Sequence, residues 1–171
     1  RMYEKEALNT PNQKPDLVIV EDSNSGFQFF RQVFDEWKIP CISANGKSNI
    51  CAEIEKTPIG TTVLIIADGA AFGPEIEKTL AQRRKRKIIL FLPESFEWMI
   101  LSSELFSDTQ TKEMLQNPEN TIESSTFFSW ERFFTKYLTD KTKDTYLHYG
   151  KRELNPVYLQ DHEKAAIMKG F

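Results

Sequence analysis

The sequence predicts an α/β protein: a four-stranded, mainly parallel sheet with helices on both faces, followed by a C-terminal helical extension. Two observations predict this class. Short runs that are apolar throughout alternate with segments of helical periodicity between residues 16 and 106, and after residue 106 the alternation stops. Because each run is continuously apolar, both faces of the expected sheet are buried, as in parallel sheets that helices cover.

The expected strands and helices follow one another in regular order. Phe30, Val33 and Phe34 recur at helical spacing after the first strand. Pro74 stands in the first turn of a later helix, where proline is tolerated because that N–H has no helical partner. The expected strands are 16–22, 40–45, 61–67 and 87–93, and the expected helices are 26–39, 48–56, 73–86 and 94–106.

Beyond residue 106 the sequence predicts helices without strands. The segment 108–121 is polar, 125–138 is an aromatic-rich amphipathic helix, and 161–170 resembles a last helix. Aromatic side chains of 125–138 suit base stacking or core packing, and packing is favoured because no basic face accompanies them. The expected organisation is a leader or linker at 1–15, an α/β domain at 16–106, and a helical extension at 107–171 packed on it.

Composition excludes several classes of protein. Two cysteines, Cys41 and Cys51, are too few for a disulfide framework and favour a reducing, cytoplasmic setting. No apolar run approaches the roughly 20 residues of a membrane span, so no membrane partner is expected. The formal net charge of -3 neither favours nor excludes nucleic acid, and the oligomeric state stays open.

Carboxylates follow three of the four expected strands. Glu21 and Asp22 end the first and Asp68 ends the third. Glu94 follows the fourth, with Glu97 one helical turn later. Ligands bind beyond the carboxyl ends of parallel strands, so these acids are expected to meet at one edge. Clustered carboxylates repel one another unless a cation lies between them, and oxygen ligands suit Mg²⁺ or Mn²⁺. Each acid alone also suits a helix N-cap, so a metal site and a set of caps both remain open.

Two motifs resemble those of Toprim domains. The stretch "VIVEDSNSGFQFF" looks like the first, a strand that ends in Glu (here Glu21) before a small-residue turn and a helix. The stretch "LIIADGAAFG" looks like the second, an Asp-x-Asp pair whose first member matches Asp68. Over roughly residues 15 to 100 the element order, which is Rossmann-like, is similar to the Toprim domain of topoisomerases, primases and OLD-family nucleases. Two positions depart: Asp22 replaces the usual Gly, and Ala70 replaces the second Asp.

The resemblance implies magnesium-dependent processing of nucleic-acid phosphodiesters, by a nuclease or by a module of a nucleic-acid machine. In the family the Glu is a general acid or base and the Asp pair holds the ion. Carried over, Glu21 moves the proton and Asp68 binds the metal, with Asp22, Glu94 and Glu97 as further ligands. Because Ala70 cannot bind a metal, a non-catalytic binding or regulatory domain stays open, and so does enzymatic activity itself.

Two basic segments complete the candidate site. The stretch "QRRKRK" places five positive charges in six residues, which suits the solvated end of a helix or a phosphate-binding patch. In the second interpretation the phosphate contacts are Arg83, Arg84, Lys85 and Arg86.

The stretch "NGKS" lies where a phosphate-binding loop belongs, but the full pattern requires a glycine at Cys41. Nucleotide binding is therefore the weaker alternative. Lys47 at this strand end is expected instead to assist catalysis by contacting a phosphate.

Overall fold

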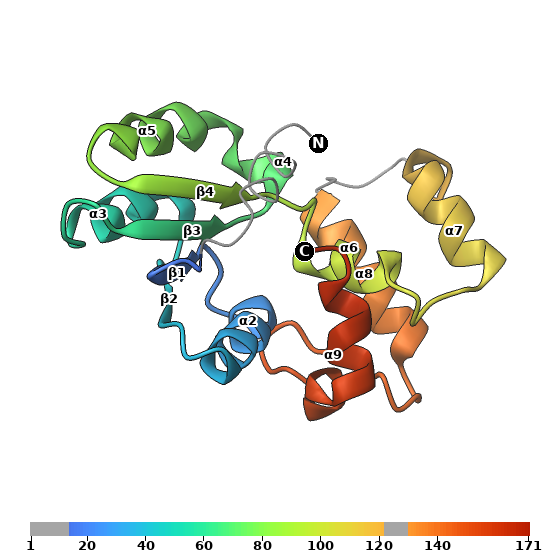
Figure 1. Cartoon of the computed structure of the whole chain (residues 1–171). Coiled ribbons are helices and arrows are strands. Elements are labelled where there is room, and N and C mark those ends of the chain that lie inside the picture. Colours follow the sequence, from blue (N-terminus) through green and yellow to red (C-terminus); the bar gives the residue numbers. More distant parts are fainter. Residues whose placement is uncertain (1–13, 122–129) are drawn as a thin grey trace. The chain divides into compact units, whose positions relative to one another are not determined.

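A computed structural model describes residues 14–121 and 130–171 of the 171-residue chain (Figure 1). The chain divides into two compact units. One, the sheet unit, runs to Glu94 and also includes Gly150–Leu154; the other, the helical unit, comprises Ser95–Tyr149 and Asn155–Phe171. The boundary predicted at residue 106 falls within the helical unit. Most of the predicted leader at 1–15 lies outside the described residues.

The sheet has four strands, all parallel, in the order β2-β1-β3-β4. Val20 of β1 pairs with Ser43 on one side and with Ile66 on the other, and Ile66 pairs in turn with Phe91. The predicted α/β class is thereby confirmed. The strands are β1 (Leu17–Val20), β2 (Cys41–Ser43), β3 (Thr62–Ile66) and β4 (Lys87–Phe91).

Helices connect the strands of the sheet unit. The predicted helix 73–86 is broken into short pieces and begins earlier, at Gly69. Pro74, which has no N–H to donate, lies in a 3-10 turn between two of these pieces. The elements are α2 (Ser25–Glu36), η1 (Lys47–Asn49), α3 (Ile50–Glu55), α4 (Gly69–Phe72), η2 (Gly73–Glu75), α5 (Ile76–Ala81) and η3 (Gln82–Arg84).

The core of the sheet unit follows from strand alternation. Ile19 and Ile65 lie in one apolar cluster with residues of α3 and α5, so these helices cover one face. The intervening residues of β1 are also buried, and α2, which contacts β1 and β2, buries Phe30 and Phe34. Burial on both sides explains the continuous apolar runs within β1, β3 and β4.

The segment Gly150–Leu154 belongs to the sheet unit because it binds the start of α2. The N–H of Ser25 donates to the Lys151 carbonyl at 2.8 Å, and the Ser25 hydroxyl donates to the Gly150 carbonyl, 125 residues away in sequence. Gln28 donates to the Arg152 carbonyl and accepts from the Leu154 N–H, each at 2.9 Å. Asn24, the residue before the helix, makes no side-chain cap, so a distant segment satisfies the first turn of α2.

The helical unit contains a helix that the sequence did not predict. Thr109–Gln116 forms α7, which has only Thr111 and Met114 buried, so its apolar periodicity is too weak to recognise in a polar segment. Phe134 and Leu138 of α8 are buried, which agrees with packing; residues 125–129 of that predicted helix lie outside the described part. The other elements are α6 (Phe96–Ser102), η4 (Pro118–Thr121), α8 (Trp130–Thr142), η5 (Pro156–Leu159) and α9 (Asp161–Met168).

Asp108, the N-cap of α7, gives the helical unit an acid-sensitive contact. Its carboxylate accepts from Thr111 N–H at 3.0 Å and from Lys141 Nζ at 2.8 Å. Burial acts to raise the pKa of Asp108, but the hydrogen bonds from Lys141 and Thr111 prevail and lower it to about 2. This carboxylate therefore contributes stability that is complete above its ordinary pKa of 3.8 and is lost as the pH falls toward about 2.

Replacing Asp108 with Asn should remove this contribution. We expect the free energy of unfolding at neutral pH to fall by about 1 kcal/mol, a value discounted because the side chain is partly exposed. The difference between the two proteins should shrink as the pH falls, as measured by urea unfolding. Asp161→Asn, at the exposed first turn of α9, is the matched control. A difference that is the same at every pH would contradict this account.

Candidate carboxyl-edge site

The strand order places a topological switch point between β1 and β3. From β1 the chain proceeds to β2 on one side, whereas β3 and β4 lie on the other. Ligands of open α/β sheets bind in the crevice outside the carboxyl ends of the strands at such a point. Glu21 and Asp22 directly follow β1, and Asp68 lies just beyond β3. Since neighbouring strands are about 4.8 Å apart, the acids of these two strands lie at the same edge.

Backbone hydrogen bonds continue beyond the last paired residues of β1 and β3. Glu21 N–H donates to Ile66 O at 2.8 Å, and Gly69 N–H donates to Pro93 O at 2.6 Å. Val20 pairs with Ile66, so Glu21 and Asp22 follow β1 next to the point where Ala67 and Asp68 follow β3. The chain bends at Glu21. All three carboxylate residues are half-buried.

The loop after β2 is bonded to the loop after β1. Gly46 N–H donates to Glu21 O at 3.0 Å, and the Ser43 hydroxyl donates to Asp22 O at 2.8 Å. The turn needs positive φ at Asn45 (55°) and at Gly46 (122°), which glycine adopts without strain. The exposed Lys47 follows at once and therefore lies at the same edge of the sheet as Glu21 and Asp22.

This geometry does not suit a phosphate-binding loop, because the Gly46 N–H is occupied by Glu21 O instead of pointing at a ligand. Cys41, where that motif requires glycine, is the first residue of β2. We therefore expect no turnover of ATP or GTP above the buffer rate, in the wild type and in Lys47→Ala alike, in a phosphate-release assay. Steady hydrolysis that Lys47→Ala abolishes would establish the nucleotide-binding alternative instead.

The predicted ligands do not form a three-carboxylate cage. Within residues 14–121 and 130–171, no three His, Cys, Asp or Glu side chains are arranged to hold a metal ion. Glu21, Asp68 and Glu94 of the sheet unit therefore form no such group, and Glu97 belongs to the other unit. Mg²⁺, however, usually keeps several waters and binds through one or two carboxylates together with substrate phosphates. The donor set at this edge fits an ion bound with a phosphate, and does not fit an ion held by the protein alone.

Glu97, predicted as a metal ligand, has a structural role in the helical unit. Its side chain is buried, and its Oε1 accepts from the Tyr149 hydroxyl at 2.9 Å and from the Thr135 hydroxyl at 3.1 Å. These bonds connect α6 with α8 and with the chain that follows α8. The donors are 38 and 52 residues from Glu97, so no sequence pattern identifies them.

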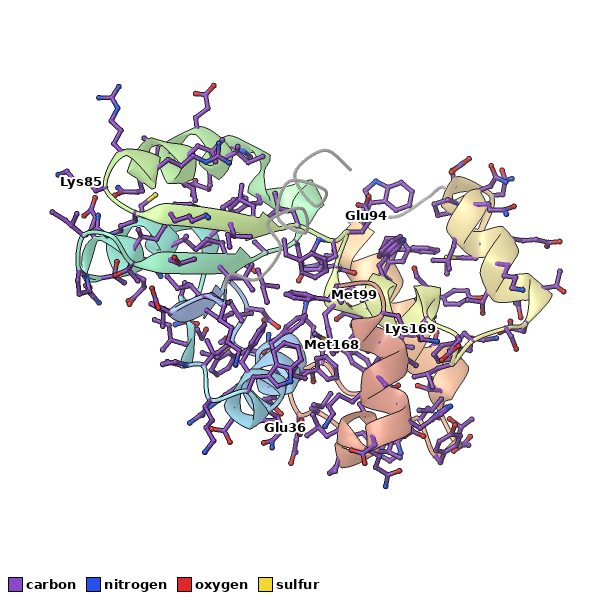
Figure 2. All side chains as sticks on the ribbon, in the orientation of Figure 1. Glu36, Lys85, Glu94, Met99, Met168 and Lys169 are labelled. Carbon is purple, nitrogen blue, oxygen red and sulfur yellow. The ribbon has the colours of Figure 1, made fainter. Side chains whose placement is uncertain are left out.

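The basic segment lies at the amino ends of the strands, opposite the carboxyl edge. Arg83, Arg84 and Lys85 precede β4, whereas Glu94 follows it, and Figure 2 shows Lys85 and Glu94 at opposite ends of the sheet unit. The five residues of β4 alone span about 15 Å. The predicted phosphate contacts at Arg83, Arg84 and Lys85 therefore cannot share one phosphate with the acids of the carboxyl edge.

Arg86 must be withdrawn from the predicted phosphate contacts because it is buried, with 9% of its surface exposed. Its guanidinium donates to the Thr57 carbonyl at 2.6 Å, to the Thr57 hydroxyl at 2.8 Å and to the Glu55 carbonyl at 3.2 Å. The last carbonyls of a helix have no intrahelical partner, and Arg86 satisfies them at the end of α3. Its role is structural.

Cys41 adds no reactive group to the carboxyl edge. Cys41 begins β2, at the amino end of that strand. Burial raises the pKa of the Cys41 thiol to about 12, against the weaker opposite effect of Arg31, so the thiol stays protonated at neutral pH. The thiolate, which is the nucleophile and the metal ligand, is therefore not formed there.

Comparisons with models of known protein families, with curated proteins and with solved structures give no match to this chain. The structure establishes an α/β protein with a parallel four-stranded sheet and acids beside its switch point. The likeness to Toprim domains rests on the two motifs and on element order. Among the described helices, none combines the length and the apolar character needed to cross a membrane.

Proposed function

We propose that the chain processes nucleic-acid phosphodiesters at the carboxyl edge, with Mg²⁺ or Mn²⁺ bound by Asp68 and Asp22 together with a substrate phosphate. One observation carries the proposal: acids from two adjacent parallel strands lie at the switch point, where ligands of such sheets bind. Glu94, at the carboxyl end of β4, is the candidate for a further ligand. The bound ion supplies Lewis-acid polarisation of a phosphoryl oxygen.

The remaining residues of the edge have distinct roles in this proposal. Glu21, directly after β1, serves as the general acid or base. Lys47 supplies a positive charge for a phosphate oxygen. Carboxylates alone would repel a phosphate backbone, so this edge accepts its substrate only when a divalent ion reverses the local charge. Binding of the ion and of the nucleic acid should therefore be coupled.

A second candidate is a nucleic-acid-binding or regulatory module that cleaves nothing. It is favoured by Ala70, which stands where Toprim domains have a second Asp, and by the lack of a three-ligand group among the described residues. The two candidates differ in what they do with a bound phosphodiester. Both need a phosphate at the carboxyl edge.

The test is a cleavage and binding assay on single- and double-stranded DNA and RNA, with Mg²⁺, Mn²⁺ or EDTA. We expect cleavage with either ion and none in EDTA. Mn²⁺ should be at least as effective, because it is bound at least as readily by a site with few protein ligands. Metal-dependent binding without cleavage would select the second candidate. Cleavage that persists in EDTA, or the absence of both binding and cleavage, would exclude a metal-dependent edge.

A further inference from the structure

The turn between α5 and β4 presents a group of exposed cations in a fixed backbone. We call it the basic turn; it comprises Arg83, Arg84, Lys85 and Lys87, all exposed. Lys85 N–H donates to Gln82 O at 3.2 Å, and Lys85 O accepts from Gly60 N–H at 2.7 Å. Lys87 N–H donates to Thr61 O at 3.0 Å. These bonds join the turn to the chain that enters β3.

Buried Arg86 holds the basic turn in place through side-chain hydrogen bonds. Its guanidinium binds the carbonyls of Glu55 and Thr57, and its Nη1 also donates to the Gln82 side chain at 3.3 Å. The turn is thereby held to the end of α3. Neighbouring cations repel one another, so a braced turn that keeps several of them together favours the approach of a polyanion.

Two acids of α3 make different side-chain contacts. Glu53 accepts from Lys56 Nζ at 2.9 Å, and Glu55 accepts from the Gln82 side-chain amide at 3.4 Å. Glu55 and Asp16 therefore lie at the same end of the sheet as the basic turn, where its four exposed cations outnumber them. The acids of the carboxyl edge lie at the opposite end of β4.

We propose that the basic turn is a second nucleic-acid-binding surface, which contacts the phosphate backbone without a metal ion and independently of the carboxyl edge. Consecutive exposed cations suit closely spaced phosphates, and each guanidinium can bind phosphate oxygens in a bidentate manner. Interfaces with proteins are instead depleted of lysine and contain an apolar core. The one large apolar side chain of the adjoining loop, Ile59, is a single exposed residue, which is ordinary on a protein surface.

The experiment compares two charge-matched double variants of the full chain. Arg84→Glu with Lys85→Glu reverses the basic turn, and Lys112→Glu with Lys143→Glu makes the same charge change at exposed positions of the helical unit. Fluorescence anisotropy follows binding of a labelled DNA duplex of about 20 base pairs in EDTA over a range of salt concentrations. Unlabelled poly-glutamate serves as a competitor that represents an acidic protein.

We expect the wild type to bind in EDTA, the turn variant to bind at least about tenfold more weakly, and its salt slope to fall by about 2, one for each lost phosphate contact. The control variant should stay within about twofold of the wild type. Equal losses in both variants, unchanged binding by the turn variant, or no binding by the wild type would each overturn the proposal. Competition by poly-glutamate as effective as that by unlabelled duplex would overturn it in favour of an acidic protein.

The failure of this proposal and the failure of the proposed function are distinguishable. Glu21→Gln and Asp68→Asn leave the basic turn intact, so both variants should bind duplex in EDTA as the wild type does. Loss of this metal-free binding in either variant would show that the two edges form one site, and would overturn an independent second surface. The cleavage assay, by contrast, tests the carboxyl edge alone.

Discussion

Asp68→Asn is expected to reduce metal-dependent cleavage by about 100-fold or more, the range that loss of a charged group in direct contact with a metal or a transferred proton produces. Asn keeps the shape of Asp but lacks its charge, and at a site with few protein ligands one carboxylate is a large share of the attraction for the ion. The affinity for Mn²⁺ in the presence of a nucleic acid should fall as well, which the EPR signal of the free ion measures without any turnover.

Glu21→Gln should give a different pattern. Because Glu21 is assigned the proton and not the ion, the catalytic rate should fall by a similar factor while the affinity for Mn²⁺ changes little. Asp35→Asn, at an exposed position in the last turn of α2, is the matched control and should leave both quantities unchanged. Wild-type cleavage by Asp68→Asn, or equal loss of Mn²⁺ affinity in both site variants, would contradict the division of roles.

The largest effect on stability is expected at Arg86. Replacing it with Met retains much of the apolar stem but leaves the carbonyls of Glu55 and Thr57 without their donors. Buried polar groups that lose a charged partner cost about 2 to 4 kcal/mol in the free energy of unfolding. We expect a lower urea midpoint with an unchanged slope.

Exposed Arg84 provides the control for this substitution, since Arg84→Met should change stability by less than about 0.5 kcal/mol. Arg86→Lys should lie between Arg86→Met and the wild type, because an ammonium cannot reproduce the fork of donors that reaches several acceptors at once. Equal midpoints for Arg84→Met and Arg86→Met would show that the bonds of Arg86 contribute nothing net.

The sheet could be predicted from the sequence because its signal is local. β3 and β4 are runs of apolar residues whose two faces are both buried, and the acids that follow β1 and β3 stand out against such runs. The carboxyl ends of parallel strands lie at the same end of a sheet. The α/β class alone therefore predicts that Glu21 and Asp68 lie at a common end. The strand order, and with it the switch point between β1 and β3, could not be read from the sequence.

The structural roles of Glu97 and Arg86 could not be predicted, because their partners are distant in sequence or are backbone atoms. In the sequence Glu97 resembles any acid in the first turn of a helix. Only the structure shows its hydrogen bonds with Tyr149 and Thr135. Arg86 lies in a run of five similar charges, of which it alone is buried. Nothing in the run distinguishes it, since the carbonyls it satisfies belong to the end of another helix.

The bonds between Gly150–Leu154 and α2 have a consequence for biosynthesis. During synthesis, Ser25 and Gln28 leave the ribosome long before Gly150 and Arg152 are added to the chain. The first turn of α2 therefore lacks these hydrogen-bond partners while more than a hundred further residues are synthesised. Contacts of such large sequence separation slow folding and prolong the exposure of apolar strands. A nascent chain halted before residue 150 should therefore hold a less protected α2 than the finished protein. Five residues at 150–154 thus help to complete a unit whose other residues all precede position 95.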